Sequence, residues 1–190
     1  MSTTINNRAW LTRAAVAITT IAVAMLLAFA GTASAALKGK TTLALDPGAA
    51  GALTSLGVSV APVAPATAGA DGVSFPITGV GGSLIPPALK VKHSGGLSLT
   101  AGPTTVSLTN YTILIDRSPD LVATVNGGPR VSILKLDLSK ARLGIGGGGL
   151  TLGPVKASLT QSAASALNGA FGVSAFTKGL VLGNATVKIG

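Results

Sequence analysis

Short stretches of alternating or β-branched apolar residues recur along the chain from residue 73 onward, a pattern typical of half-buried β-strands. Clusters rich in glycine, proline, asparagine and serine separate these stretches and predict tight turns. The clearest cluster is Asn126-Gly127-Gly128-Pro129, because Asn-Gly favours the positive φ angles of a β-hairpin turn. The predicted strands span residues 73–77, 97–100, 105–108, 111–116, 121–125, 131–138, 150–152, 155–159 and 185–189. Regular short strands of this kind predict an all-β fold, either a sandwich or barrel-like sheets.

Two segments, residues 49–56 and 163–170, carry apolar residues at helical spacing instead. Each follows a residue that can cap a helix N-terminus and precedes a glycine suited to a helix end. The predicted caps are Asp46, followed by Pro47, and Thr160, and the predicted terminal glycines are Gly57 and Gly172. Leucine and alanine also recur at the same relative positions in the two segments. This indicates either two related strand–helix–strand units or chance in an alanine-rich chain. The prediction is therefore a β-domain with two short helices.

The N-terminus has the three-part layout of a secretory signal peptide. Arg8 and Arg13 form a positive start, an apolar run extends from Ala14 to Ala30, and Ala33-Ser34-Ala35 provides a small-x-small cleavage pattern. The run is at the short limit of what a bilayer requires, so an uncleaved membrane anchor is the alternative. We predict that residues 1–35 are a signal peptide and that residues 36–190 form a single domain, which is secreted or held at the cell surface.

The composition excludes several classes of function. The chain has no cysteine, one histidine and five acidic residues, all of them aspartate. These are too few for disulfides, cysteine metal sites, thiol nucleophiles and most acid–base chemistry, so we expect a protein that is not an enzyme.

The chain is basic. Without Arg8 and Arg13, the 14 basic residues become 12, which against five aspartates gives residues 36–190 a net charge of +7. This charge favours anionic partners such as cell-envelope polymers or lipid headgroups. Nucleic acid is not expected, because no aromatic residues are interleaved with the basic ones to stack on bases. A membrane is expected as a partner only through an uncleaved N-terminal segment.

Two local motifs have a structural interpretation. The stretch Gly144–Gly149 formally matches the GxGxxG dinucleotide fingerprint, but the following Leu-Thr-Leu-Gly-Pro cannot begin a helix and no acidic residue follows it. These glycines instead predict the tip of a hairpin. Asp116 and Asp120 lie on either side of Arg-Ser-Pro, and acids around a proline turn are more often turn formers than a catalytic or calcium-binding pair.

His93 is the strongest candidate for a ligand-binding side chain. On a strand, Val91 and His93 share one face, whereas Lys90 and Lys92 share the other. His93 then points to the apolar side, next to a Gly-Gly turn. Such a histidine is either a partner of iron or haem or a hydrogen-bonded core residue, and the spacing does not decide between the two.

The stretch His93-Ser94-Gly95-Gly96-Leu97-Ser98-Leu99 resembles the H-x-G-x-L-x-L stretch of the HtaA-type haem-uptake domains of actinobacteria. Phe75-Pro76 looks like the F-P that precedes this stretch, and residues 121–125 and 133–138 look like the later strands of the family. In that family the domain is exported, often surface-attached, and binds haem through a tyrosine of the first helical segment, with the motif histidine close by. Residues 46–56 contain no tyrosine, so this chain looks like a divergent member.

The resemblance implies an exported, non-enzymatic domain that binds or transfers haem at the cell surface. The expected haem site contains His93, which matches the motif, and Tyr111, the one tyrosine of the chain, as the other candidate for the iron contact. Lys90 and Lys92 are the expected partners of the haem propionates. No catalytic residue and no separate metal site is expected. The alternative is a structural or adhesive cell-surface β-domain that has lost haem binding.

Overall fold

The computed structural model describes residues 38–83, 88–146 and 149–190, and strands predominate in this part of the chain. The predicted signal peptide lies outside the described residues. The strands are β1 (Gly39–Leu45), β2 (Ser59–Val63), β3 (Thr67–Gly69), β4 (Gly72–Ser83), β5 (Ala88–His93), β6 (Gly96–Ala101), β7 (Thr104–Ile115), β8 (Asp120–Val125), β9 (Arg130–Asp137), β10 (Arg142–Gly146), β11 (Gly149–Leu159) and β12 (Val181–Ile189). The helices are α2 (Pro47–Ser55) and α3 (Gln161–Phe171). The predicted all-β fold with two short helices is confirmed.

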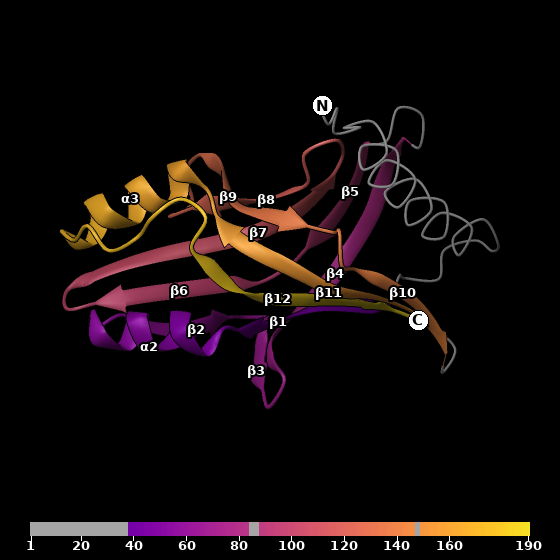
Figure 1. Cartoon of the computed structure of the whole chain (residues 1–190), viewed down its shortest axis with the longest axis horizontal. Helices are drawn as coiled ribbons and strands as arrows, with labels where there is room; N and C mark the ends of the chain where they lie inside the picture. The colour runs from indigo at the N-terminus through magenta and orange to yellow at the C-terminus, as the bar shows by residue number, and fades with distance from the viewer. Residues whose placement is uncertain (1–37, 84–87, 147–148) are drawn as a thin grey trace, which may run out of the picture.

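Eight of the strands close into an antiparallel barrel, so the barrel-like alternative is the one adopted. Around the ring their order is β7, β5, β4, β1, β12, β11, β9 and β8, and β8 pairs with β7 to close it (Figure 1). β6 pairs with β7 and β2 with β6, which extends the sheet outward from the ring. β3 pairs with β4, and β10 pairs with β11. Closure satisfies the backbone hydrogen bonds of the ring strands on both sides and encloses an interior.

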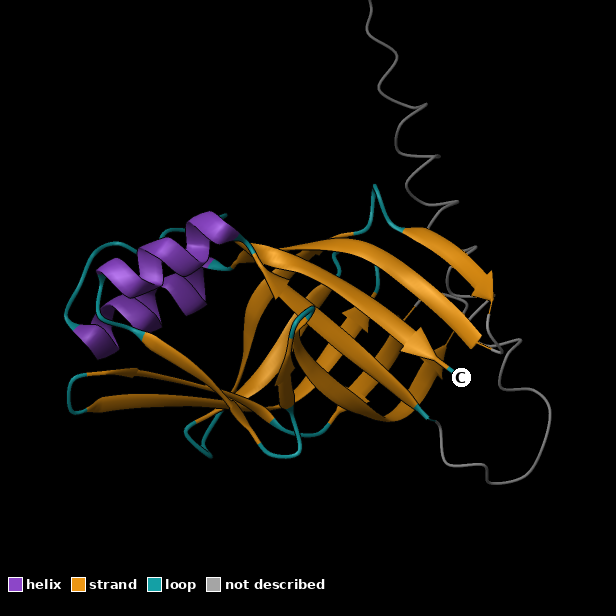
Figure 2. Ribbon diagram, turned by 90° about the horizontal axis from the view of Figure 1, so that it is seen from below, coloured by secondary structure: helices purple, strands orange, loops and turns teal. Residues whose placement is uncertain are grey.

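Both helices lie at one end of the barrel (Figure 2). Their starts follow from the predicted caps: Asp46 and Thr160 accept hydrogen bonds from first-turn backbone amides at 2.9 and 3.1 Å. α2 contacts β12, and α3 contacts β9 and β7. Each helix joins two strands, in the orders β1–α2–β2 and β11–α3–β12, but β12 belongs to the ring whereas β2 belongs to its extension. Within the described ranges, neither helix is long and apolar enough to cross a membrane.

The structure corrects the prediction where a turn-forming residue lies inside a strand. The predicted strands 105–108 and 111–116 are one strand, β7, which continues through Asn110 at a φ of +53°. The predicted strands 150–152 and 155–159 are likewise one strand, β11, with a register shift at Gly153-Pro154. Pairing with neighbouring strands continues on both sides of each irregularity, so these residues mark bulges rather than turns. β1, β2, β3 and β10 have no counterpart among the predicted strands, and β5 was assumed only in the analysis of His93.

Two predicted hairpins are present. The Asn126–Pro129 turn joins β8 to β9, with φ angles of +49° at Asn126 and +71° at Gly127. The glycines of the GxGxxG match lie on the β10–β11 hairpin, where Ile145 pairs with Leu150. Residues 147–148 at its tip lie outside the described residues. A dinucleotide-binding site requires a helix directly after the glycine-rich turn. Neither hairpin is followed by a helix at its turn, so the structure also argues against dinucleotide binding.

Candidate ligand-binding cavity

The interior of the barrel is not filled by side chains but holds a cavity of about 570 Å³. Folded cores normally contain voids no larger than a few water molecules, whereas ligand pockets span about 300–1,000 Å³. The ring strands line the cavity together with Leu53 of α2 and with Ala163, Ala166, Leu167 and Ala170 of α3. Only four lining side chains are polar, and none is charged; the four are Thr41, His93, Tyr111 and Asn126. The cavity therefore suits a largely apolar ligand with few polar groups.

The cavity extends to the surface at the helix end of the barrel. Ala166 and Ala170 of α3 and Pro129 of the β8–β9 turn line it and are exposed. Arg130 follows Pro129 directly, and its guanidinium donates a hydrogen bond to the carbonyl of Asn110 at 3.1 Å. It also donates to the hydroxyl of Thr112 at 2.8 Å, so the guanidinium lies over the outer face of β7, on the same side of the barrel wall as Lys92. The sequence analysis did not single out Arg130, because its position depends on the pairing of β8 with β7 and β9.

His93 points into the cavity from β5 and is 5% exposed. Its Nε2 atom lies 2.7 Å from the hydroxyl oxygen of Thr41 on β1, whereas its Nδ1 atom has no hydrogen-bond partner among the described residues. Burial lowers the pKa of His93 to about 4, an effect that the nearby backbone of Tyr111 and Val91 partly offsets. The ring is therefore neutral near pH 7. If Nε2–H donates to Thr41, the Nδ1 lone pair is free to accept a hydrogen bond or bind a metal.

Tyr111 points into the same cavity from β7 and is 4% exposed. Its ring packs edge-on against Phe75, with centroids 5.0 Å apart. The hydroxyl has no hydrogen-bond partner in the described part of the chain. Burial raises the pKa of Tyr111 above its ordinary value, although the nearby Leu97 backbone opposes this, so the phenol keeps its proton. Tyr111 thus lines the cavity and carries a buried, unpaired O–H group.

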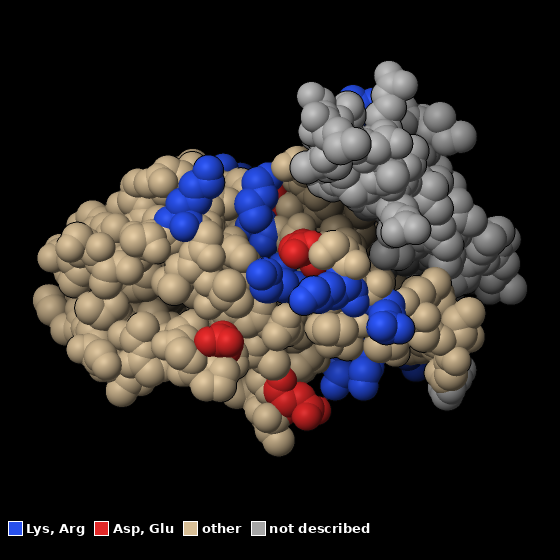
Figure 3. Space-filling view, in the orientation of Figure 1, with Lys and Arg blue, Asp and Glu red and all other residues tan. Residues whose placement is uncertain are grey.

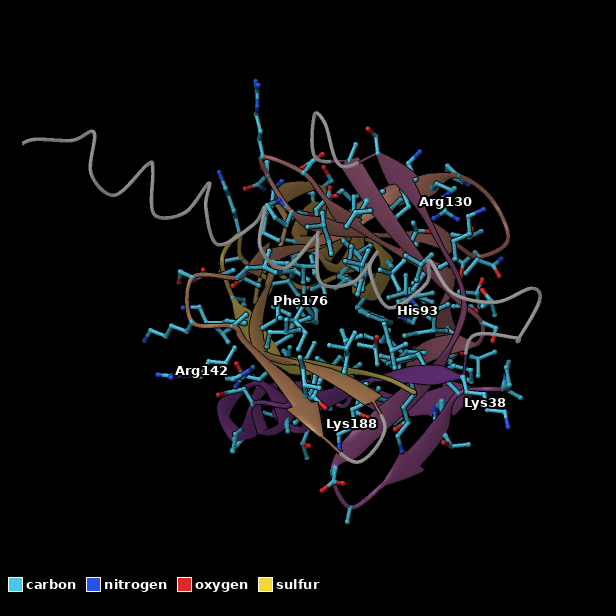
Figure 4. All side chains as sticks on the ribbon, turned by 90° about the vertical axis from the view of Figure 1, so that its right-hand side faces the viewer. Lys38, His93, Arg130, Arg142, Phe176 and Lys188 are labelled. Atoms are coloured by element: carbon cyan, nitrogen blue, oxygen red, sulfur yellow. The ribbon has the colours of Figure 1, made fainter. Side chains whose placement is uncertain are left out.

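Strand pairing brings His93 and Tyr111 together. β5 and β7 are antiparallel, with Val91 opposite Ile113 and Lys92 opposite Thr112. His93 and Tyr111 occupy the next position of this register, on the inner face of the ring. Figure 4 looks into the barrel and shows His93 inside it. An unpaired buried polar group costs about 1–3 kcal/mol, so two such groups on neighbouring residues that line one cavity mark it as a candidate site for a polar partner.

The structure does not bring Lys90 and Lys92 to the cavity. Both are exposed on the outer face of β5, whereas Val91 and His93 are buried on its inner face. The alternation predicted from the sequence is therefore confirmed. It also separates the two lysines from His93 by the barrel wall, so neither lies among the lining residues.

The other candidate residues have structural roles. Asp116 accepts a hydrogen bond from the backbone amide of Ser118 at 2.7 Å, which forms the predicted turn. Asp120 accepts from the hydroxyl of Ser132 across the β8–β9 pair at 2.6 Å. Among the described residues, no group of three or more His, Cys, Asp or Glu side chains could hold a metal ion.

Comparison with known proteins identifies the fold. No protein-family model matches the sequence, and no curated protein is significantly similar to it. The C-terminal domain of HtaA from Corynebacterium glutamicum matches with a TM-score of 0.58 at 16% identity, over 81% of this chain and 99% of that domain. The N-terminal domain of the same protein matches with a TM-score of 0.57 at 14% identity, over 84% of this chain and 98% of that domain.

These similarities extend over nearly the whole of both HtaA domains. At such low identity they show the fold and not the ligand. The chain therefore has the HtaA-type fold, and the resemblance inferred from the His93–Leu99 motif is confirmed at that level.

Proposed function

We propose that this chain is a non-enzymatic HtaA-type domain that binds haem in the barrel cavity. The observation that carries the proposal is the pair of buried, unpaired polar atoms, His93 Nδ1 and the Tyr111 hydroxyl, on two residues that line a largely apolar cavity. The resemblance of the His93–Leu99 stretch to HtaA-type domains implies haem uptake, and the fold of the two HtaA domains is the one adopted here. A cavity of this volume without the two unpaired polar atoms and without the HtaA-type fold would support only a generic apolar ligand.

The donor set of the cavity fits haem. Imidazole nitrogen and phenol oxygen are both axial ligands of haem iron in proteins, and the apolar walls match the porphyrin faces. The iron of bound haem would supply a Lewis-acidic centre that one of these two atoms could coordinate. Asn126, which lines the cavity, would be the polar side chain available to the propionates. The residues present thus fit the iron and the porphyrin faces.

We infer that His93 would hold the haem iron and that Tyr111 would support it. Neutral His93 binds iron through its free nitrogen without losing a proton, because its pKa is already low. Tyr111 has to lose its proton first, against a raised pKa. Thr41 holds the other ring nitrogen of His93 and so fixes the ring orientation.

Haem titration of protein beginning at Ala36 tests the proposal. We expect a visible absorption band distinct from that of free haem. His93→Ala removes the favoured ligand and abolishes the shifted band, while Tyr111→Phe keeps the ring packing and weakens binding about tenfold. Lys92→Ala is the matched control, because it changes the same strand on its outer face and leaves the band unchanged.

Two results contradict parts of this scheme. Wild-type protein without a distinct band overturns haem binding, and the alternative of a structural or adhesive cell-surface domain then takes its place. A band that survives in His93→Ala but is lost in Tyr111→Phe assigns the iron to Tyr111 instead. Circular dichroism of each variant separates lost binding from lost folding.

We also propose that the domain is exported and acts outside the cytoplasm or at the cell surface. The apolar run of residues 14–30 followed by Ala33-Ser34-Ala35 supports this. Mass spectrometry of secreted material is expected to find a first residue of Ala36. Mature protein that still contains Trp10 would contradict cleavage and favour a membrane anchor.

A further inference from the structure

The β10–β11 hairpin carries an exposed apolar side chain at the barrel end opposite the helices. Ile145 is 83% exposed and is the large apolar side chain that stands out to solvent in the described part of the chain. Leu150 lies opposite it, and Leu143 precedes it on the same face; both are partly buried. This face continues the inner surface of the barrel beyond its end, which leaves Ile145 without a packing partner from the barrel itself.

Basic residues surround the same end. Lys38, Lys40 and Lys188 line a shallow hollow together with Gly146 and Gly149 of the hairpin. Figure 4, viewed from this end, shows Lys38, Lys188 and Arg142 around the edge of the barrel. Figure 3 shows Lys and Arg forming a band across one face of the molecule, with acidic groups beside it. The hollow is lined by three lysines and no acid.

These lysines are not neutralised within the described residues. Lys40 lies directly opposite Lys188 in the β1–β12 pair, an arrangement of like charges that disfavours pairing. Four of the five aspartates make contacts elsewhere: Asp46 caps α2, Asp116 and Asp137 hold turns, and Asp120 accepts from the hydroxyl of Ser132. Ion pairs among the described residues therefore do not explain the lysines of the hollow beside Ile145.

We propose that this end of the barrel docks on a bilayer that contains anionic phospholipids. Ile145 inserts at the level of the headgroup–acyl boundary, and Lys38, Lys40, Lys188 and Arg142 contact the lipid phosphates. The combination of an apolar tip with surrounding cations selects a membrane, because a soluble polyanion uses the cations but not the isoleucine. Lys38, the first described residue, lies at this end as well.

Docking in this orientation leaves the cavity free. The exposed lining residues of the cavity lie at the helix end, on α3 and the β8–β9 turn. The proposal stands independently of haem binding, since none of the docking residues lines that cavity.

Vesicle sedimentation tests the docking surface in protein beginning at Ala36, which contains all the barrel strands. Vesicles of phosphatidylcholine mixed with phosphatidylglycerol are expected to bind the protein, and vesicles of phosphatidylcholine alone are not. Ile145→Ser weakens binding about tenfold, whereas Ile145→Leu retains it. Lys188→Gln weakens binding about fivefold, and Lys40→Gln added to it lowers binding by a similar factor again.

Lys178→Gln is the matched control, because Lys178 is exposed in the connection between α3 and β12, at the other end of the barrel. Its binding is expected to equal that of the wild type. Equal binding by Ile145→Ser and wild type overturns membrane docking, as does a lysine variant that binds as tightly as Lys178→Gln. Binding to a soluble anionic polymer that is insensitive to Ile145→Ser would assign the lysines to a cell-envelope polymer instead and equally overturn the proposal. We expect the same variants to bind haem as the wild type does. A failure of membrane docking can therefore be told apart from a failure of haem binding.

Discussion

At the scale of single residues, His93 combines burial, one hydrogen bond and one unpaired nitrogen. Burial of an imidazole disfavours its charged form, and Thr41 holds Nε2 without supplying a charge. The folded state therefore keeps His93 neutral well below the pH at which a free histidine takes up a proton. This makes the stability of the apo-domain depend on pH.

We predict that the free energy of unfolding falls as pH drops from about 6.5 to about 4. In this window the unfolded chain binds a proton at His93 and the folded chain does not, so acid favours unfolding. The pKa of about 4 corresponds to a loss of up to about 3 kcal/mol across the window. Urea unfolding of wild type and of His93→Gln at several pH values measures this effect.

The variant isolates His93 because every other titrating group is common to both proteins. The difference in unfolding free energy between wild type and His93→Gln is expected to shrink toward acid. A difference that stays constant from neutral pH to pH 4 would show that His93 is accessible to protons in the folded state.

Half of the candidate site could be predicted from local sequence. Strand alternation places Val91 and His93 inward and Lys90 outward, because the side-chain period of two depends on the strand alone. The partnership of His93 with Tyr111 could not be predicted in this way, since it depends on which strand pairs with β5. Thr41 was also missed, because β1 lies beside β4, which separates it from β5, and is far from His93 in the sequence.

At the scale of elements, the glycine of the His93–Leu99 motif has a steric explanation. Gly95 has a φ of +79° at the junction between β5 and β6, where the chain passes from the ring to its extension. A Cβ atom there would lie 2.5 Å from the backbone nitrogen of Ala66 and 2.8 Å from the carbonyl oxygen of Val63. The junction thus packs against the turn between β2 and β3, which only glycine permits.

Substitution of Gly95 by alanine is expected to destabilise the protein by at least about 3 kcal/mol, because both the φ angle and the backbone contact oppose a Cβ atom. Gly57→Ala is the matched control, since Gly57 has a φ of +68° but open space around its Cβ position. It is expected to cost only about 1 kcal/mol. Chemical unfolding of both variants measures the two values, and equal costs would contradict the steric explanation.

The starts of the two helices could be predicted from local sequence, whereas the continuity of the long strands could not. Asp46 and Thr160 cap their helices as predicted, because a cap acts on amides within the next three residues. Asn110 and Gly153-Pro154 look like turn formers, but neighbouring strands hold both segments in the sheet. Tertiary pairing therefore overrides the local turn signal at these positions.

At the scale of the whole molecule, β1 completes the ring. It pairs with β12 along its full length and with β4 on its other side, so the first and last described strands lie side by side. The chain has no cysteine that could form a disulfide to hold the barrel closed. Closure therefore depends on packing and on the backbone hydrogen bonds of strands such as β1.

Two truncations test this dependence. Protein beginning at Ala36 keeps β1 and is expected to be monomeric, with a circular dichroism spectrum dominated by strand and unaffected by reducing agents or chelators. Protein beginning at Asp46 lacks β1, which exposes the edges of β4 and β12 and removes Thr41 from His93. We expect it to aggregate in size-exclusion chromatography. A monomeric, strand-rich protein from Asp46 onward would show that the ring closes without β1, and a helix-dominated spectrum from the longer protein would contradict the barrel itself.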